Sequence, residues 1–74
     1  MSLEKNELIS LANEYMPYGK YKGLNLIDLP EPYVVWYYHK GLPQNRLGKL
    51  LGLLYEIKLN GLEHLVYPLK TKTS

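Results

Sequence analysis

The spacing of apolar residues predicts a first helix over residues 3–15. Four apolar positions recur at i, i+3, i+4 and i+7, which places their side chains on one face of a helix. These positions are Leu8, Leu11, Ala12 and Tyr15. Pro17 closes the segment, because a proline disfavours helical geometry in the residue before it.

A second helix is predicted from Pro30 to Gly41. Pro30 and Pro32 suit a first helical turn, whose backbone N–H groups have no partner within the helix. Gly41 suits the end of a helix. The helix would carry three aromatic side chains on one face, namely Tyr33, Trp36 and Tyr37.

A third helix is predicted from about Gln44 to Asn60, with Gly61 following its end. Its apolar stripe consists of Leu47, Leu50, Leu51 and Leu54. Gly48 and Gly52 lie four residues apart on this helix. Because a helical glycine costs about 1 kcal/mol relative to alanine, we expect another element to pack closely there. That element is either the hairpin described next or a second subunit.

Residues 16–26 predict a short β-hairpin. Gly19 and Gly23 lie four residues apart, with alternating basic and aromatic residues between them. Residues 62–69 form a short apolar segment, which predicts an edge strand or a final turn. Pro68 argues against a central strand. The expected fold is therefore α+β, a single small domain over residues 1–69 in which a short hairpin packs on about three helices. Residues 70–74 are expected to form a flexible tail.

The predicted core combines the apolar faces of these elements. It consists of Leu8, Leu11, Leu26, Leu29, Trp36, Tyr37, Leu47, Leu50, Leu51 and Leu54.

Composition narrows the possible functions of this chain of 74 residues. The absence of cysteine excludes disulfides and thiolate zinc sites, and two histidines are too few for an all-histidine zinc site. No apolar run reaches the roughly 18 residues of a membrane span, and no signal peptide is visible. We therefore expect a cytoplasmic protein that contacts no membrane and needs no cofactor or metal.

The charge is concentrated in the middle of the chain. The net charge is +2, and residues 16–49 carry five basic against two acidic residues. Any attraction to phosphate must therefore come from a local patch rather than from the whole protein. Tyrosine supplies eight of the nine aromatic residues, and its apolar ring with a polar tip suits half-buried positions and interfaces.

The hairpin is the leading candidate for a nucleic-acid interface. In an extended segment Lys20 and Lys22 point to the same side, where their ammonium groups would contact phosphate. Tyr18 and Tyr21 would stack on unpaired bases, and the two glycines would let backbone amides approach a phosphate. The full candidate set is Tyr18, Gly19, Lys20, Tyr21, Lys22, Gly23, Lys40, Arg46 and Lys49. The alternative is a purely structural hairpin whose lysines are solvated.

No pattern in the chain predicts catalysis. Asp28 and Glu31 favour the start of the second helix, and His39 suits its end. Glu63 and His64 lack the spacing of a metal-binding helix. We therefore expect a protein that is not an enzyme. The second functional alternative is a protein-interaction or homodimer module, whose contact surface would comprise Tyr38, Gly48 and Gly52.

Three separated motifs resemble one small bacterial family of unknown function, named for putative quorum-sensing-regulated virulence factors. They are the Met-Pro-Tyr-Gly-Lys-Tyr-Lys-Gly run of residues 16–23, the Leu-Pro-x-x-Tyr-x-x-Trp run of residues 29–36 and the Asn-Gly-Leu at residues 60–62. The resemblance covers residues 16–69. The Gly-Lys-Tyr-Lys-Gly segment is also similar to one appended to some DnaQ-like exonucleases, which implies an accessory role beside nucleic acid. It implies no catalysis by this chain.

Overall fold

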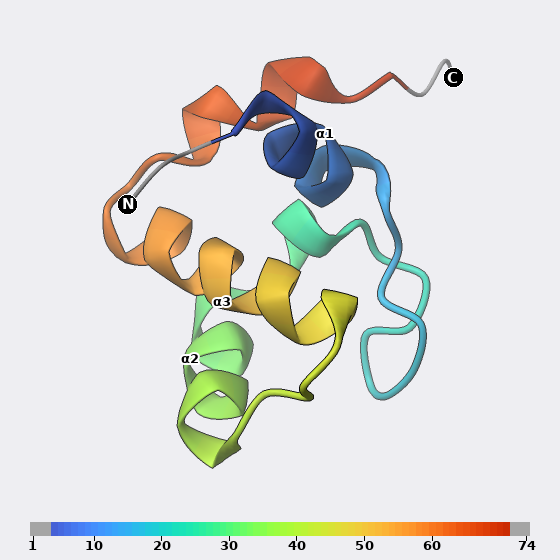
Figure 1. The fold of residues 1–74 in the computed structure, drawn as a ribbon, viewed down its shortest axis with the longest axis vertical. Helices are drawn as coiled ribbons and strands as arrows, with labels where there is room; N and C mark the ends of the chain where they lie inside the picture. The colour runs from blue at the N-terminus through green and yellow to red at the C-terminus, as the bar shows by residue number, and fades with distance from the viewer. Residues whose placement is uncertain (1–3, 72–74) are drawn as a thin grey trace.

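The computed structural model describes residues 4–71, whose regular elements are all helical (Figure 1). Three α-helices and three short 3₁₀ turns follow one another along the chain. They are α1 (Lys5–Asn13), η1 (Leu26–Asp28), α2 (Glu31–Lys40), α3 (Arg46–Leu59), η2 (Glu63–Leu65) and η3 (Tyr67–Leu69). Figure 1 shows α3 crossing the middle of the molecule, with α1 on one side and α2 on the other, and α3 contacts both.

The core lies where these three helices and η1 meet. Its members are Leu11, Ala12, Met16, Leu26, Ile27, Leu29, Val34, Leu50, Leu51, Leu54, Ile57 and Val66. Asn25 is the buried polar residue at its edge, and its side-chain amide donates to the Ala12 carbonyl oxygen at 2.8 Å. Burial of this amide is therefore compensated by a hydrogen bond.

The predicted β-hairpin is wrong, and so is the α+β class, because residues 4–71 form no strand or sheet. The loop of residues 14–25 is closed by a single antiparallel bridge between Tyr15 and Asn25. Beyond that bridge, Gly23 N donates across the loop to the Met16 carbonyl. The other backbone bonds are those of turns, from Lys22 N to the Gly19 carbonyl and from Leu24 N to the Tyr21 carbonyl. Gly19 and Gly23 have positive φ values of 82° and 94°, so the segment coils where an extended strand was expected.

The first helix ends earlier than predicted, at Asn13. Glu14 adopts extended geometry, and its carbonyl accepts a hydrogen bond from Leu26 N. The hydrogen bond between Glu14 and Leu26, at the far end of the loop, thus takes the place of the helical hydrogen bonds expected for residues 14–15. Tyr15 consequently leaves the helical face and is 60% exposed, while Met16 enters the core. The predicted start at residue 3 lies outside the described residues.

The predicted second and third helices are confirmed, with starts one or two residues later than expected. Pro30 precedes the first residue of α2, and Gly41 ends the helix with a φ of 119°. Asn45 caps α3, since its side-chain oxygen accepts a hydrogen bond from Gly48 N at 3.0 Å. Such a cap satisfies a backbone N–H that has no partner within the helix.

Most predicted core leucines are buried, but Trp36 is not. Trp36 is 53% exposed, because Val34 is the residue of α2 that faces the core. Leu8, Tyr37 and Leu47 pack at the edge of the core. The predicted core omitted six buried apolar residues, namely Ala12, Met16, Ile27, Val34, Ile57 and Val66.

Residues 62–69 form the turns η2 and η3 where an edge strand or a final turn was expected. Lys70 pairs with Asp28 at 2.8 Å, and Thr71 donates through its backbone N–H to the Asn13 side chain. The Asn13 amide also donates to the Leu69 carbonyl oxygen. The chain after α3 is therefore held against the end of α1 as far as Thr71. The rest of the predicted tail lies outside the described residues.

The element that packs on the glycines of α3 is the linker of residues 42–43. A Cβ atom at Gly48 would lie 1.6 Å from the Pro43 carbonyl oxygen. At Gly52 a Cβ would meet only the Leu42 Cδ1 atom, at an ordinary 3.5 Å. Gly48 therefore permits a backbone-to-backbone approach within one chain, and Gly52 does not face such a constraint.

We predict that Gly48→Ala destabilises the fold by about 2 kcal/mol or more, because a rigid backbone atom occupies the space of the new methyl group. Gly52→Ala is the matched control and should be neutral or stabilising by up to about 1 kcal/mol, the helix-propensity gain. Urea unfolding of both variants measures the difference. Equal stability of the two variants would contradict the close approach at Gly48.

Candidate ligand-binding site

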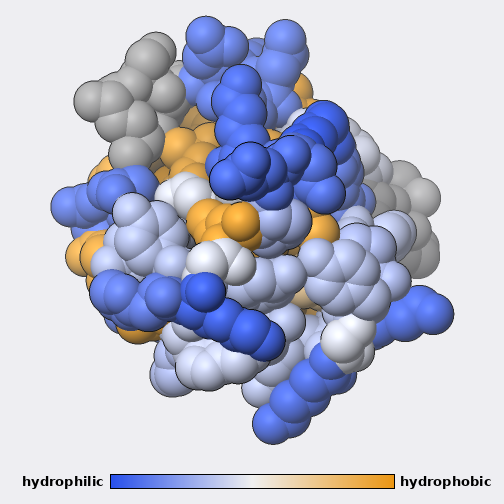
Figure 2. Space-filling view, turned by 60° about the horizontal axis from the view of Figure 1, so that its bottom comes forward, coloured by the Kyte–Doolittle hydropathy of each residue, from blue (hydrophilic) through white to orange (hydrophobic). Residues whose placement is uncertain are grey.

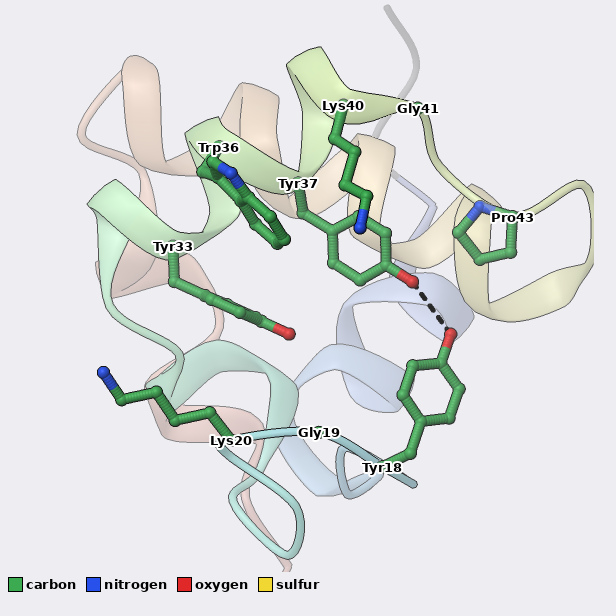
Figure 3. A pocket seen from close by; sticks show the side chains of 9 residues that line it. All are labelled: Tyr18, Gly19, Lys20, Tyr33, Trp36, Tyr37, Lys40, Gly41 and Pro43. Carbon is green, nitrogen blue, oxygen red and sulfur yellow. Dashed lines mark hydrogen bonds between the residues drawn. The ribbon is translucent and has the colours of Figure 1, made fainter.

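An open hollow of about 630 Å³ lies between the loop of residues 14–25 and α2 (Figure 3). We refer to it as the aromatic hollow. It is lined by Tyr18, Gly19, Lys20, Tyr33, Trp36, Tyr37, Lys40, Gly41 and Pro43. Its volume falls within the range of sites for small molecules, about 300–1,000 Å³. Figure 2 shows the face that α2 presents, where side chains of intermediate hydropathy gather between hydrophilic ones.

The helical repeat of α2 turns three aromatic side chains toward this hollow. Tyr33, Trp36 and Tyr37 occupy positions i, i+3 and i+4 of the helix, so they share one face. Tyr33 and Trp36 stack with centroids 5.9 Å apart, and Tyr37 lies edge-on to Tyr33 at 6.0 Å. The ring of Tyr21 supports Tyr33 from the loop side, edge-on at 4.8 Å. The result is one continuous aromatic wall.

A hydrogen bond between two phenols joins the loop to α2. The hydroxyl groups of Tyr18 and Tyr37 lie 2.9 Å apart across the hollow (Figure 3). This hydrogen bond, helped by burial, raises the pKa of Tyr37 to about 12. Burial, with the neighbouring Tyr18 and Tyr21, also raises the pKa of Tyr33. The wall therefore stays uncharged at physiological pH.

Two ammonium groups flank the aromatic wall. The Lys40 Nζ atom lies 4.9 Å from the Trp36 ring centroid, and the Lys20 Nζ atom lies 5.5 Å from the Tyr21 ring centroid. In Figure 3 the Lys40 side chain reaches toward the hollow, whereas the Lys20 ammonium points outward. The lining residues include no Asp or Glu. The hollow thus combines apolar ring faces with net positive charge.

Only part of the predicted nucleic-acid set lies at the aromatic hollow. Tyr18, Gly19, Lys20 and Lys40 line it, and Tyr21 supports it from behind. Lys22 and Gly23 do not line it. The expected shared orientation of Lys20 and Lys22 assumed an extended strand, and the turn at these residues removes that basis.

Arg46 and Lys49 lie elsewhere, at a second hollow of about 400 Å³ between α1 and α3. Arg46 donates to both carboxylate oxygens of Glu14 and to the Ser10 hydroxyl. The hydrogen bond from Arg46 holds the pKa of Glu14 below its usual range. Lys49 lies 3.4 Å from a Glu7 carboxylate oxygen. These two cations are therefore paired with carboxylates of α1 and of Glu14, which follows it, and they do not line the aromatic hollow.

The sequence prediction missed five lining residues, namely Tyr33, Trp36, Tyr37, Gly41 and Pro43. The helical spacing of the three aromatic residues was visible in the sequence, but Trp36 and Tyr37 were assigned to the core. The signal that favours the opposite interpretation is their polar tips, since a tyrosine or tryptophan suits a half-wet surface.

Tyr38, the third member of the predicted contact surface with Gly48 and Gly52, does not line the aromatic hollow. Its ring stacks on Tyr55 of α3 with centroids 3.7 Å apart and remains 40% exposed. His39 lies edge-on to both rings. That these residues contact another chain stays a prediction.

No group of three or more His, Cys, Asp or Glu residues that could hold a metal occurs within residues 4–71. Across the same residues, no helix combines the length and apolar character needed to cross a membrane.

Comparison with known proteins gives a family but no ligand. Residues 4–69 match the model of a family described as "Putative quorum-sensing-regulated virulence factor". Two relatives are each called "Uncharacterized protein YpeB", one from Escherichia coli strain K12 and one from Escherichia coli O157:H7. Each is 51% identical over 69 residues, which cover 92% of this chain and 96% of the relative. No solved structure matches the chain.

We predict that Tyr18→Phe lowers the pKa of Tyr37 toward its ordinary value of 10.0, because the variant loses the hydrogen bond that favours the neutral phenol. The stabilisation of the wild-type fold by this shift is complete below the unfolded pKa and is lost as pH rises through about 12. NMR titration of ring-labelled tyrosines measures the midpoint, with Tyr38→Phe as the control. An unchanged Tyr37 midpoint in Tyr18→Phe would show that the hydroxyl pair does not form.

Proposed function

The chain belongs to the family of putative quorum-sensing-regulated virulence factors, and we propose from its geometry that it is a non-enzymatic accessory module that contacts single-stranded nucleic acid through the aromatic hollow. The observation that carries the proposal is the pairing of an aromatic wall with two ammonium groups and no carboxylate in one open hollow. Neither the family description nor the relatives' names specify a ligand, so the proposal rests on this chemistry alone.

The aromatic wall favours a ligand with a flat ring. Bases of a single strand have accessible faces, and stacking on an aromatic side chain contributes about 1–3 kcal/mol per base. Trp36 offers the most exposed ring of the wall, at 53%. In a duplex the base faces are already stacked on one another, so this wall favours unpaired bases.

The charge favours a ligand with phosphates. Lys40 holds its ammonium above Trp36, where a phosphate next to a stacked base would lie. Lys20 lies on the opposite side of the hollow, on the loop (Figure 3). Only these two cations line the hollow, and Arg46 and Lys49 are paired elsewhere. We therefore expect modest affinity that depends on salt.

The groups that line the hollow favour binding over catalysis. They are phenols, an indole, two ammonium groups and backbone atoms, without a carboxylate or imidazole. General acid–base catalysis at neutral pH uses groups with pKa values near 7. Both resolved shifts in the wall instead raise the pKa of a phenol.

The alternative, a protein-interaction or homodimer module, rests on a different surface. Its best support is the Tyr38–Tyr55 stack, which keeps a large ring exposed at the junction of α2 and α3. Tyrosine is enriched at protein interfaces because it combines a large apolar area with a hydroxyl group. Neither Tyr38 nor Tyr55 lines the aromatic hollow, so the two functions predict binding at different surfaces.

We predict that Lys20→Gln/Lys40→Gln weakens the binding of labelled oligothymidylate and flattens its salt dependence. The slope of log K against log salt should fall by about 1.4, since each single-strand phosphate contact contributes about 0.7. Fluorescence anisotropy at several salt concentrations measures both quantities.

Lys5→Gln/Lys49→Gln is the matched control for this experiment. It removes the same two charges from residues that do not line the aromatic hollow. Equal weakening by both double variants would mean that net charge, not the hollow, attracts the strand. No binding by the wild-type protein even at low salt would refute the proposed function and favour the protein-interaction alternative.

We predict that Trp36→Ala weakens binding by about tenfold or more while leaving the salt slope unchanged, because stacking and phosphate contacts are separate contributions. Trp36 is largely exposed and outside the core, so the variant should fold, which circular dichroism would verify. A salt slope that falls with this variant would contradict the assignment of Trp36 to stacking.

A further inference from the structure

We propose that the aromatic hollow is a short site, which accommodates a stretch of about two nucleotides and does not continue into a track for a longer strand. This inference rests on the proposed function and adds the size of the ligand. It follows from the packing of the rings and from the distribution of free and paired cations.

The rings form one platform rather than a row of platforms. Tyr33 contacts Tyr21, Trp36 and Tyr37 with centroid separations of 4.8, 5.9 and 6.0 Å, and Trp36 and Tyr37 are also 5.9 Å apart. Successive bases of a long strand each need an aromatic face of their own. Rings that are packed on one another offer their shared outer faces to one or two bases only.

The phenol hydroxyls close the far side of the platform. The hydrogen bond between Tyr18 and Tyr37 spans the hollow from the loop to α2. In Figure 3 the Tyr33 hydroxyl points toward the middle of the hollow. A strand bound between Lys20 and Lys40 would therefore meet this hydrogen-bonded pair at one side of the hollow.

Four cations beyond the hollow are engaged by groups of the protein itself. Carboxylates pair with three of them, Arg46 with Glu14, Lys49 with Glu7 and Lys70 with Asp28. Lys58 donates to the Ile27 carbonyl oxygen. A single-strand groove instead needs a line of cations that follows the backbone. Of the described cations, Lys20 and Lys40 are the two that line the hollow.

The volume agrees with this size. A hollow of about 630 Å³ is typical of a site for one small ligand, about 300–1,000 Å³. Two cations also predict a salt slope of about −1.4, whatever the length of the strand outside the hollow.

The test is a length series of oligothymidylates with two, four, eight and sixteen nucleotides, which form no internal pairs. Quenching of the fluorescence of Trp36, the single tryptophan of the chain, reports occupancy of the hollow itself. Anisotropy of a label on the strand reports total binding. Each dissociation constant is divided by the number of overlapping sites that the strand offers.

We expect the affinity per site to change by less than about threefold from four to sixteen nucleotides, with a salt slope near −1.4 throughout. An affinity per site that rises more than tenfold over this range, with a steeper slope, would overturn the short site and leave the proposed function intact. Failure of every strand to quench Trp36 or to raise the anisotropy would overturn both.

Lys20→Gln/Lys40→Gln completes the experiment. The affinity of the variant for the four-nucleotide strand and for the sixteen-nucleotide strand should fall by the same factor, because both strands depend on the same two cations. If the variant no longer binds the short strand but still binds the long one, the long strand contacts a second surface, and the short-site proposal is overturned.

Discussion

The approach of the Pro43 carbonyl to the backbone of α3 at Gly48 fixes the position of α2, and the aromatic hollow depends on it. The linker between α2 and α3 is short, and it can lie flat on α3 only because Gly48 has no side chain. This contact brings Gly41, Pro43 and Lys40 to one end of the hollow. The other wall depends on the pairing of Tyr15 with Asn25, which closes the loop that carries Tyr18 and Lys20. Two backbone constraints therefore hold the two halves of the hollow in place.

The small core explains why so many aromatic rings lie at the surface. A chain of this length buries a limited apolar volume, and here leucine, isoleucine, valine, alanine and methionine fill it. Val34 is the buried residue of α2, whereas Tyr33 and Tyr37 only pack against the edge of the core and Trp36 is 53% exposed. These rings cover one another instead, and their polar tips remain at the surface. The aromatic wall is thus a consequence of how α2 packs.

The sequence was informative where local chemistry decides the structure. Pro30, Gly41 and Asn60 mark the ends of α2 and α3, because the backbone requirements of helix ends are local. The hairpin prediction failed at Gly19 and Gly23, since a glycine spacing compatible with a tight hairpin also permits a coiled loop with turn hydrogen bonds. Trp36 was assigned to the core because helical spacing identifies a shared face without identifying what that face meets.

The candidate site was predictable only in part, because its charge depends on contacts between distant residues. Lys20 and Lys40 are twenty positions apart and come together through the fold of the loop against α2. Arg46 has the same formal charge, yet it is bound by Glu14, a residue 32 positions away. No local pattern distinguishes a cation that is paired from one that is available. Because Arg46 and Lys49 are paired, the basic segment of residues 16–49 contributes only Lys20 and Lys40 to the lining of the hollow.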